Sequence, residues 1–422
     1  MDKIRNLLRI MGPGLLYAGA AIGVSHLVQS TRAGAYFGFE LIWAIILANL
    51  MKYPFFQFAP RYTAATGQNL IEGYKKLGNW AVILYLILTI LSMFVIQAAV
   101  TIVTAGLFGY VFGINLSAAA ISAILLFVTM ILLFYGRYSL LDKLIKWVII
   151  LLAVSTVVAV IASAMKGYHP QPQFAKGFDI GIMTNVAFLI ALFGWMPAPL
   201  DISIWQSIWA EAKAKEQGIK VSKKQALLDF NIGYIGTAVL AIGFLSLGAL
   251  VMYGTGEELS KKGAVFAGQL ISMYVGSIGS WSYWIIAVAA LMTMVSTTLT
   301  CFDAYARVMG PATKLSFPNL FKNNKLSEKK MYIFWMVVVF TGTLVILTFF
   351  TENMMYMVDF ATILSFIVAP LFGVLNLKVI THDHVPEEDR PSRWMRIYAI
   401  LGIIFLTGFS IYYIYFRITT AS

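Results

Sequence analysis

The stretch that decides how this chain folds lies inside its first apolar segment, which reads Ala20-Ala21-Ile22-Gly23-Val24-Ser25-His26. Glycine loses the most backbone freedom on ordering and β-branched valine adds little helix propensity, so a helix is weakest at Gly23. Two hydrogen-bonding side chains, Ser25 and His26, follow directly. Polar groups at membrane depth are costly and are usually kept for function. The stretch therefore predicts a break in a membrane helix that forms half of a substrate site.

The composition places the chain in a membrane. Of its 422 residues, 60% are hydrophobic and 12% are charged, whereas a soluble domain has about 45–50% apolar and about 25% charged residues. Cys301 is the one cysteine, which excludes an intrachain disulfide framework and a cysteine zinc site. The N-terminal residues carry no cleavage pattern of a signal peptide, so we expect the first segment to be retained.

Eleven apolar segments are long enough to span a bilayer. Each is expected to be a helix, because the lipid core offers no partner for unpaired backbone groups. A single transmembrane domain over residues 1–422 is expected, with no soluble domain appended. The segments are residues 12–37, 41–66, 79–109, 117–135, 141–166, 181–209, 229–253, 277–309, 331–351, 354–378 and 396–417.

The basic residues predict the orientation of the chain. The formal net charge is +12, and with the N-terminus in the cytoplasm 22 of the 31 lysines and arginines fall in cytoplasmic loops and five fall outside. This bias follows the positive-inside rule, so the basic excess argues for a lipid bilayer and against nucleic acid as the partner. We expect a multi-pass protein of a cell membrane, of the prokaryotic inner-membrane kind.

A second interruption falls in segment 181–209. Gly194, Pro197 and Pro199 lie within six residues of one another, and each proline lacks an amide donor and clashes with the preceding helical turn. Breaks in matching places of two halves indicate a transporter site between inverted repeats. We therefore expect a 5+5 inverted repeat over residues 12–166 and 181–378, with a peripheral helix at 396–417.

Several motifs spread along the chain carry a family resemblance. They include Gly12-Pro13-Gly14-Leu15-Leu16, Ala33-Gly34-Ala35-Tyr36-Phe37-Gly38, Thr66-Gly67-Gln68-Asn69-Leu70, Met196-Pro197 and Phe366-Ile367-Val368-Ala369-Pro370-Leu371. Together they resemble the Nramp family of divalent-metal transporters over essentially the whole chain. The resemblance implies an all-α membrane protein with the LeuT-like fold of the amino acid–polyamine–organocation superfamily, in which helices 1 and 6 are interrupted mid-membrane. It also implies a divalent metal ion as the substrate.

The residues at the family's metal site have changed. Its first-helix signature is Asp-Pro-Gly-Asn, in which Asp and Asn bind the metal, and the matching residues here are Gly23, Val24, Ser25 and His26. Its Met-Pro-His signature becomes Met196-Pro197-Ala198, which keeps the thioether and loses the imidazole. The family's proton-moving acids in helix three and arginines in helix nine have no counterpart here. The resemblance thus supports the architecture more than the usual proton-coupled manganese or iron chemistry.

The candidates for substrate binding surround the two breaks: Ala20, Gly23, Ser25, His26, Phe193, Trp195, Met196 and Asp201. Imidazole and sulfur suit a softer transition metal, so His26 and Met196 are the candidate metal ligands, beside carbonyls freed near Ala20 and Phe193. His26 could equally hydrogen-bond a solute, carry a proton or simply pack. Asp201 could act as a ligand or gate, or form a structural ion pair with Lys52. Trp195 could stack on an organic solute or pack.

A hydroxyl-rich run and an acid–base pair lie in segment eight. Ser296, Thr297 and Thr298 could form a sodium or polar site that faces helix one, or they could bond back to carbonyls of their own helix. Asp303 and Arg307 are four residues apart on one helical face, so we expect them to pair.

Two charged residues are expected near the outer entrance or a gate. Arg32 would make the outer vestibule positive, which favours an anion or zwitterion over a cation, or it would contact a headgroup or carbonyl. Asp359 could partner a site residue or close a gate.

These features together predict a secondary transporter that works by alternating access. Since no nucleophile–base arrangement, phosphate loop or HExxH spacing occurs, neither an enzyme nor a cofactor is expected, and no oligomer is implied. The family-implied substrate is a divalent metal ion, moved without the usual proton coupling. A small organic solute or anion is the alternative, favoured by the lost carboxylate and by Arg32. The second alternative is a non-transporting membrane sensor.

Overall fold

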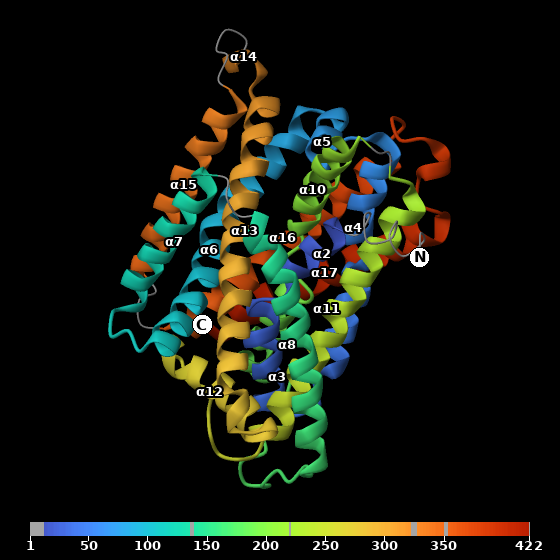
Figure 1. Ribbon diagram of the computed structural model, residues 1–422. Coiled ribbons are helices and arrows are strands. Elements are labelled where there is room, and N and C mark those ends of the chain that lie inside the picture. Colours follow the sequence, from blue (N-terminus) through green and yellow to red (C-terminus); the bar gives the residue numbers. More distant parts are fainter. Residues whose placement is uncertain (1–11, 136–138, 219–220, 322–326, 350–352, 422) are drawn as a thin grey trace, which may run out of the picture.

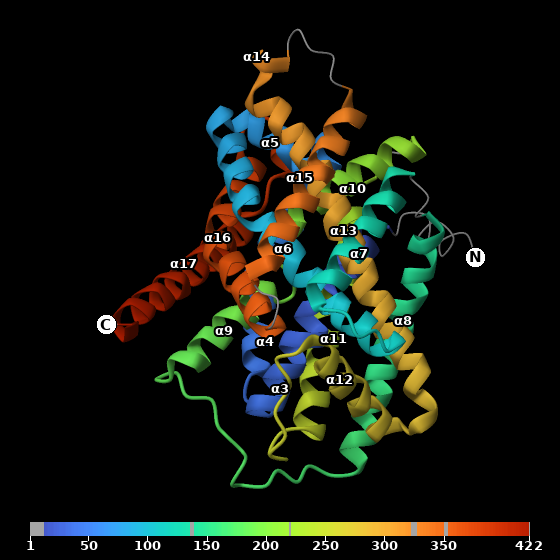
Figure 2. The same cartoon turned by 90° about the vertical axis from the view of Figure 1, so that its left-hand side faces the viewer.

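The computed structural model describes residues 12–135, 139–218, 221–321, 327–349 and 353–421, and every regular element in these ranges is a helix (Figure 1). Eight of the described helices are long and apolar enough to cross a membrane. They are α4 (Ile42–Thr66), α6 (Asn79–Phe112), α8 (Ser139–Met165), α11 (Lys223–Val251), α13 (Tyr283–Ser316), α15 (Glu328–Phe349), α16 (Met354–Thr381) and α17 (Arg393–Ala421). Figure 2 shows α17 at the edge of the bundle.

The remaining predicted segments are one shorter helix and two broken ones. The shorter helix is α7 (Ala118–Phe134). Segment one consists of α2 (Pro13–Ala21), the π-helix η1 (Ser25–Ser30) and α3 (Thr31–Phe37). Segment six consists of α9 (Met183–Trp195) and α10 (Ile202–Gln217). The all-α architecture with interruptions in segments one and six is therefore confirmed.

Several boundaries differ from the predicted ones. In segment 181–209, α10 continues eight residues beyond the predicted end. Residue 277 belongs to a separate helix, α12 (Gly263–Ile278), which Gly279 (φ +127°) separates from the short η2 (Ser280–Ser282) and α13. The short helices α5 (Leu70–Leu77), α14 (Pro318–Phe321) and η3 (Glu387–Asp389) were also not predicted. In α5 the Asn69 side chain caps two amides, a local stabilisation that hydropathy does not detect.

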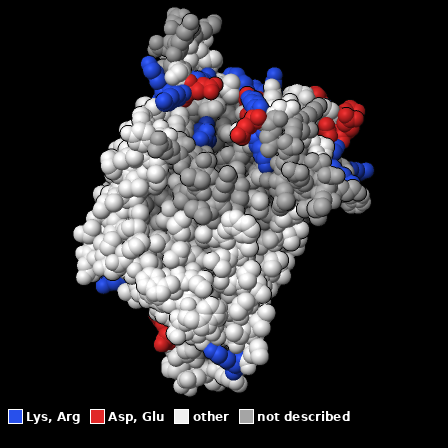
Figure 3. All heavy atoms as spheres, viewed as in Figure 1, with Lys and Arg blue, Asp and Glu red and all other residues white. Residues whose placement is uncertain are grey.

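Charge is concentrated at one end of the bundle. On the face shown in Figure 3, most Lys, Arg, Asp and Glu lie at the end where Figure 1 places α5, α10 and α14, and few lie at the opposite end. Between the ends runs a wide band with almost no charge. Large apolar side chains are exposed on the helices of the bundle, such as Phe127, Val239 and Ile404. This distribution is that of a protein surrounded by lipid.

Glycines hold both halves of segment one directly against α11. A Cβ at Gly14 would lie 2.2 Å from the Asp229 carbonyl oxygen, and one at Gly34 would lie 1.9 Å from the Leu245 carbonyl oxygen. Only glycine permits such close approach of two helix backbones. The Asp229 carboxylate also accepts hydrogen bonds from the amides of Gly12 and Gly14, at 3.2 and 2.7 Å. Segment one is therefore anchored at both ends, with its break between the anchors.

Candidate functional site

The break in segment one is closed by a threonine of α13. After α2, Ile22 is extended (φ −78°, ψ 95°), so its carbonyl leaves the helical ladder. The Thr297 hydroxyl lies 3.2 Å from this carbonyl and 3.0 Å from the Thr293 carbonyl of its own helix. Thr297 thus faces helix one and also bonds back to α13, so both interpretations of this residue describe part of its geometry.

We expect Gly23→Ala to destabilise the protein by about 1–3 kcal/mol, which is the usual cost of overpacking. The new Cβ would lie 2.8 Å from Thr297 Oγ1 and 2.9 Å from its Cγ2. Thermal unfolding measures the effect, and the double variant with Thr297→Ala should recover the steric part. If the double variant is as unstable as the two single changes combined, the Gly23–Thr297 contact is not the cause.

His26 lies in η1 and is directed toward α11. Its Nε2 lies 2.9 Å from the Thr237 carbonyl oxygen, and its Nδ1 lies 2.7 Å from Ser25 Oγ, which is 2.6 Å from the Ala21 carbonyl oxygen. A carbonyl only accepts, so Nε2 carries a proton. The side chain is fully buried, and both ring nitrogens are engaged. In this conformation His26 therefore has no free nitrogen for a metal, and a ligand role requires these bonds to open.

The break in segment six spans Met196–Asp201 and begins with a cis Met196–Pro197 peptide bond. Three backbone carbonyls of this region converge on the ammonium group of Lys52, which is fully buried and comes from α4. Lys52 Nζ donates to the carbonyls of Phe193, Gly194 and Ala198 at 2.6, 2.7 and 3.2 Å. The first two lie at the C-terminal end of α9, where the helix dipole is negative.

The predicted direct ion pair between Lys52 and Asp201 is wrong. All three ammonium protons have carbonyl acceptors, and Asp201 Oδ2 instead accepts from the Tyr305 hydroxyl at 3.0 Å. Asp201 Oδ1 has no hydrogen-bond partner among the described residues. The carbonyls freed at the end of α9 outcompete the carboxylate for the ammonium, although the two charges still interact electrostatically.

The other candidates of segment six pack against neighbouring helices. Trp195 Nε1 donates to Ser365 Oγ of α16 at 2.8 Å, so the indole is oriented by packing. Phe193 contacts two rings of α17, those of Phe405 and Phe409. Met196 is fully buried, and Ala20 of segment one is only 5% exposed. In this conformation segment six presents backbone groups, more than side chains, to a substrate.

Arg32 does not leave the outer vestibule positive, contrary to one prediction. Its guanidinium forms a bidentate ion pair with Asp359 of α16, at 2.6 and 3.0 Å. Gln29 bonds to both partners, accepting from Arg32 at 2.9 Å and donating to Asp359 at 3.0 Å. The guanidinium also lies 5.0 Å from the ring centre of Phe188 in α9. This cluster ties α3 to α16 and α9, and its role as a gate stays a prediction.

The remaining residues of segment eight diverge. Thr298 Oγ1 lies 2.7 Å from Thr104 Oγ1 of α6, so it faces away from the break that Thr297 closes, and Ser296 is buried. Arg307 Nε pairs with Asp303 Oδ2 at 2.6 Å, and the Tyr332 hydroxyl also donates to Asp303. A sodium site at the hydroxyl run stays a prediction.

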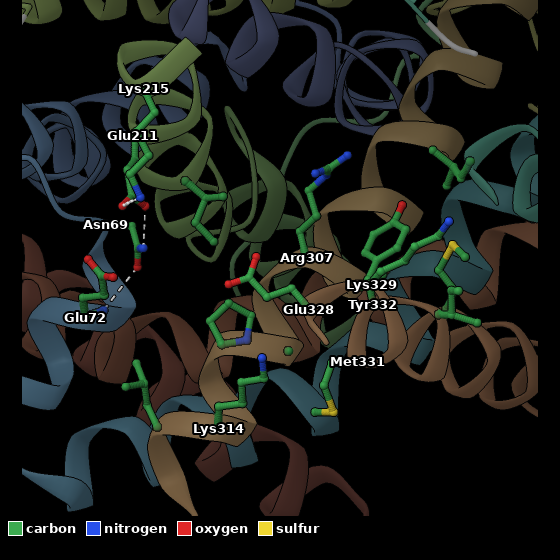
Figure 4. Close-up of a pocket in the computed structure, with 18 of the residues that line it drawn as sticks. Asn69, Glu72, Glu211, Lys215, Arg307, Lys314, Glu328, Lys329, Met331 and Tyr332 are labelled. Carbon is green, nitrogen blue, oxygen red and sulfur yellow. Dashed lines mark hydrogen bonds and ion pairs between the residues drawn. The ribbon is translucent and has the colours of Figure 1, made fainter. Parts of the chain in front are cut away.

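A cavity of about 640 Å³ at the charged end was not predicted. It lies between α5, α10, α13 and α15 (Figure 4), and Glu211 on its wall accepts from Asn69 at 2.7 Å and from Lys215 at 2.6 Å. Burial, followed by the nearby Glu211, raises the pKa of Glu72. The residues that line this cavity come from segments far apart in the sequence, so no local pattern indicates it.

Within the described ranges no group of three or more His, Cys, Asp or Glu could hold a metal ion.

Comparison with known proteins adds family membership to this geometry. A natural resistance-associated macrophage protein-like (Nramp) family model matches residues 14–416. Uncharacterized protein PM0681 of Pasteurella multocida is 36% identical over 409 residues, which is 96% of this chain and 91% of the relative. The divalent metal cation transporter MntH of Listeria welshimeri is 26% identical, over 99% of this chain and 91% of its own.

A solved structure agrees in fold. The manganese transporter of Eremococcus coleocola, in complex with an aromatic bis-isothiourea compound, superposes with a TM-score of 0.67 at 15% identity, over 97% of this chain and 87% of its own. The fold similarity and the family match each cover nearly the whole chain. This chain is a membrane protein of the Nramp family, whose members are transporters with the LeuT-like fold.

Proposed function

We propose that this protein is an alternating-access secondary carrier whose substrate binds between the two breaks. The observation that carries the proposal is their juxtaposition: η1 packs on α9, and α2 packs on α10. One break comes from each inverted repeat, residues 12–166 and 181–378, with 396–417 peripheral. The Arg32–Asp359 ion pair would close the outer side. The charged end and the N-terminus would face the cytoplasm of a prokaryotic cell.

A divalent metal ion is the first substrate class, because MntH of Listeria welshimeri is named a divalent metal cation transporter and the Eremococcus coleocola protein a manganese transporter. Met196, His26 and Asp201 would be its side-chain ligands, with the carbonyls near Ala20 and Phe193. Because this chain lacks the acids of the family's proton route, we expect uncoupled or differently coupled transport.

A small organic solute or anion is the second class, and one observation favours it. Five of the carbonyls at the breaks already have donors of this chain: Ser25 for Ala21, Thr297 for Ile22, and Lys52 for Phe193, Gly194 and Ala198. A dication would have to displace these donors and approach the Lys52 ammonium. An anionic group, in contrast, is attracted by that ammonium.

Titration of the purified protein separates the two classes. Heat on adding Mn²⁺, Mg²⁺ or Ca²⁺ would support the metal, whereas stabilisation by small carboxylic acids without metal heat would sink it in favour of the organic anion. Uptake into proteoliposomes that contain a pH-sensitive dye then tests coupling, because proton influx that tracks the substrate contradicts our expectation. If neither class binds or is moved, the carrier proposal fails and the alternative of a non-transporting sensor gains support.

His26→Ala is expected to lower uptake of the ligand found in that titration by about tenfold or more, as for loss of about 1.4 kcal/mol of binding. The imidazole links η1 to α11 beside the break, so its loss disturbs the site in two ways. His384→Ala, outside the membrane helices, is the matched control and should transport normally. Unchanged uptake and affinity in His26→Ala would remove His26 from the site.

A further inference from the structure

We propose that Lys52 is the resident cation of the segment-six break. Its ammonium group fills a carbonyl site that would otherwise take a monovalent cation, so no inorganic cation binds there in the wild-type protein. The proposal concerns the carbonyls of Phe193, Gly194 and Ala198, so a carried metal ion would need ligands other than these three.

The coordination of the ammonium group is the first argument. Three carbonyl oxygens, two from the end of α9 and one from the break itself, lie 2.6, 2.7 and 3.2 Å from Nζ. An ammonium group has three protons, so each oxygen receives one and no donor remains. Ammonium and potassium ions are close in radius, and converging backbone carbonyls are the ligands that potassium sites use. The break is thus built as a small cation site with a lysine in it.

The charge around this site is the second argument. The C-terminal end of α9 contributes a negative partial charge, and buried Asp201, with Oδ1 unpartnered, adds electrostatic attraction from the far side of the break. Buried carbonyls without a donor are costly. A positively charged donor meets both conditions at once, and Lys52 supplies it from α4, which packs on both α9 and α10.

The type of side chain is the third argument. A lysine ammonium is a compact charge with three donors, whereas an arginine guanidinium is a flat fork suited to paired carboxylate oxygens. The chain uses each where its geometry suits: Arg32 meets the two oxygens of Asp359, and Lys52 meets three separate carbonyls. Three separate acceptors suit a lysine ammonium group that takes the place of a spherical cation.

Thermal unfolding of Lys52→Ala in different chloride salts at one ionic strength tests the proposal. In choline chloride we expect its Tm to lie about 4 °C or more below that of the wild type. Potassium, ammonium or an alkylammonium ion from methyl to propyl should enter the vacated site and raise the Tm saturably, by about 2 °C or more. The wild type, and the control Lys262→Ala at an exposed lysine, should not respond to the choice of cation.

Three results would overturn the proposal: a Lys52→Ala variant as stable as the wild type in choline, a variant that no cation rescues, or a wild type that the same cations stabilise equally. If Lys52→Ala does not fold, Lys52→Met keeps the unbranched stem and leaves the carbonyls to a free cation. Stabilisation of the wild type by the same cations would refute the proposal even if neither variant folds. Cation rescue in a protein that transports nothing would preserve this inference and refute the carrier function, so the two failures are distinguishable.

Discussion

Gly194→Ala is expected to destabilise the protein by about 3 kcal/mol or more and to prevent transport. A Cβ at this position would lie 2.0 Å from the Thr362 carbonyl oxygen and 2.7 Å from the Thr362 carbonyl carbon. These are backbone atoms of α16, so no rotamer change relieves the clash, and overpacking of this kind costs about 1–3 kcal/mol even where side chains can adjust. The helix that would have to shift is α9, whose last carbonyls hold Lys52. Thermal unfolding and proteoliposome uptake measure the two consequences.

The matched control for this change is Gly236→Ala in α11. An added Cβ there meets nothing within 4 Å, and alanine exceeds glycine in helix propensity by about 1 kcal/mol. We therefore expect Gly236→Ala to be neutral or slightly stabilising. A Gly194→Ala protein that unfolds at the same temperature as this control would show that the close approach of α9 to α16 is not required.

Asp359→Asn is expected to open the outer side of the carrier. Arg32, only 6% exposed, would lose a bidentate carboxylate. Breaking a fully buried pair costs about 3–5 kcal/mol, and since the Asp359 side chain is 27% exposed we expect about 2 kcal/mol here. A cysteine at Ser25 in a Cys301→Ser background reports the opening, because Ser25 is buried between the break and the ion pair. Its alkylation should be faster in the Asp359→Asn protein.

The control for the ion pair is the double variant Arg32→Gln with Asp359→Asn. It removes both charges, so no buried charge is left unpaired, and it should recover part of the lost stability. A cycle in which the two single effects simply add would mean that Arg32 and Asp359 do not interact. Unchanged alkylation in all variants would mean that the pair does not gate the site.

The features that the sequence predicted are local ones. A spanning helix is a matter of segment length and hydropathy, and the breaks follow from glycine and proline within a few residues. Both breaks fall where these residues predict, at Ile22–Gly23 and Met196–Asp201. The π-helical turn after the first break has no such signature, and α5 and α12 were missed because they are short.

The features that escaped prediction join residues far apart. Lys52 and Asp201 are opposite charges in two apolar segments, so a pair was the natural hypothesis. The competing acceptors were backbone carbonyls, which every residue has and which the sequence does not distinguish. Arg32 and Asp359 are 327 residues apart, and helices that are apolar on all sides carry no pattern showing which face meets which neighbour. The two breaks could therefore be located along the chain, but their contacts could not be assigned.

The anchoring of Lys52 has a consequence for how the break responds to its surroundings. A ligand attached to the protein binds intramolecularly, so its effective concentration depends on the tether and not on the medium. Dilution does not remove it, and exchange of one salt for another does not alter its supply. The ammonium group of Lys52 therefore occupies the carbonyls at the end of α9 whatever the ionic composition of the two solutions that the membrane separates.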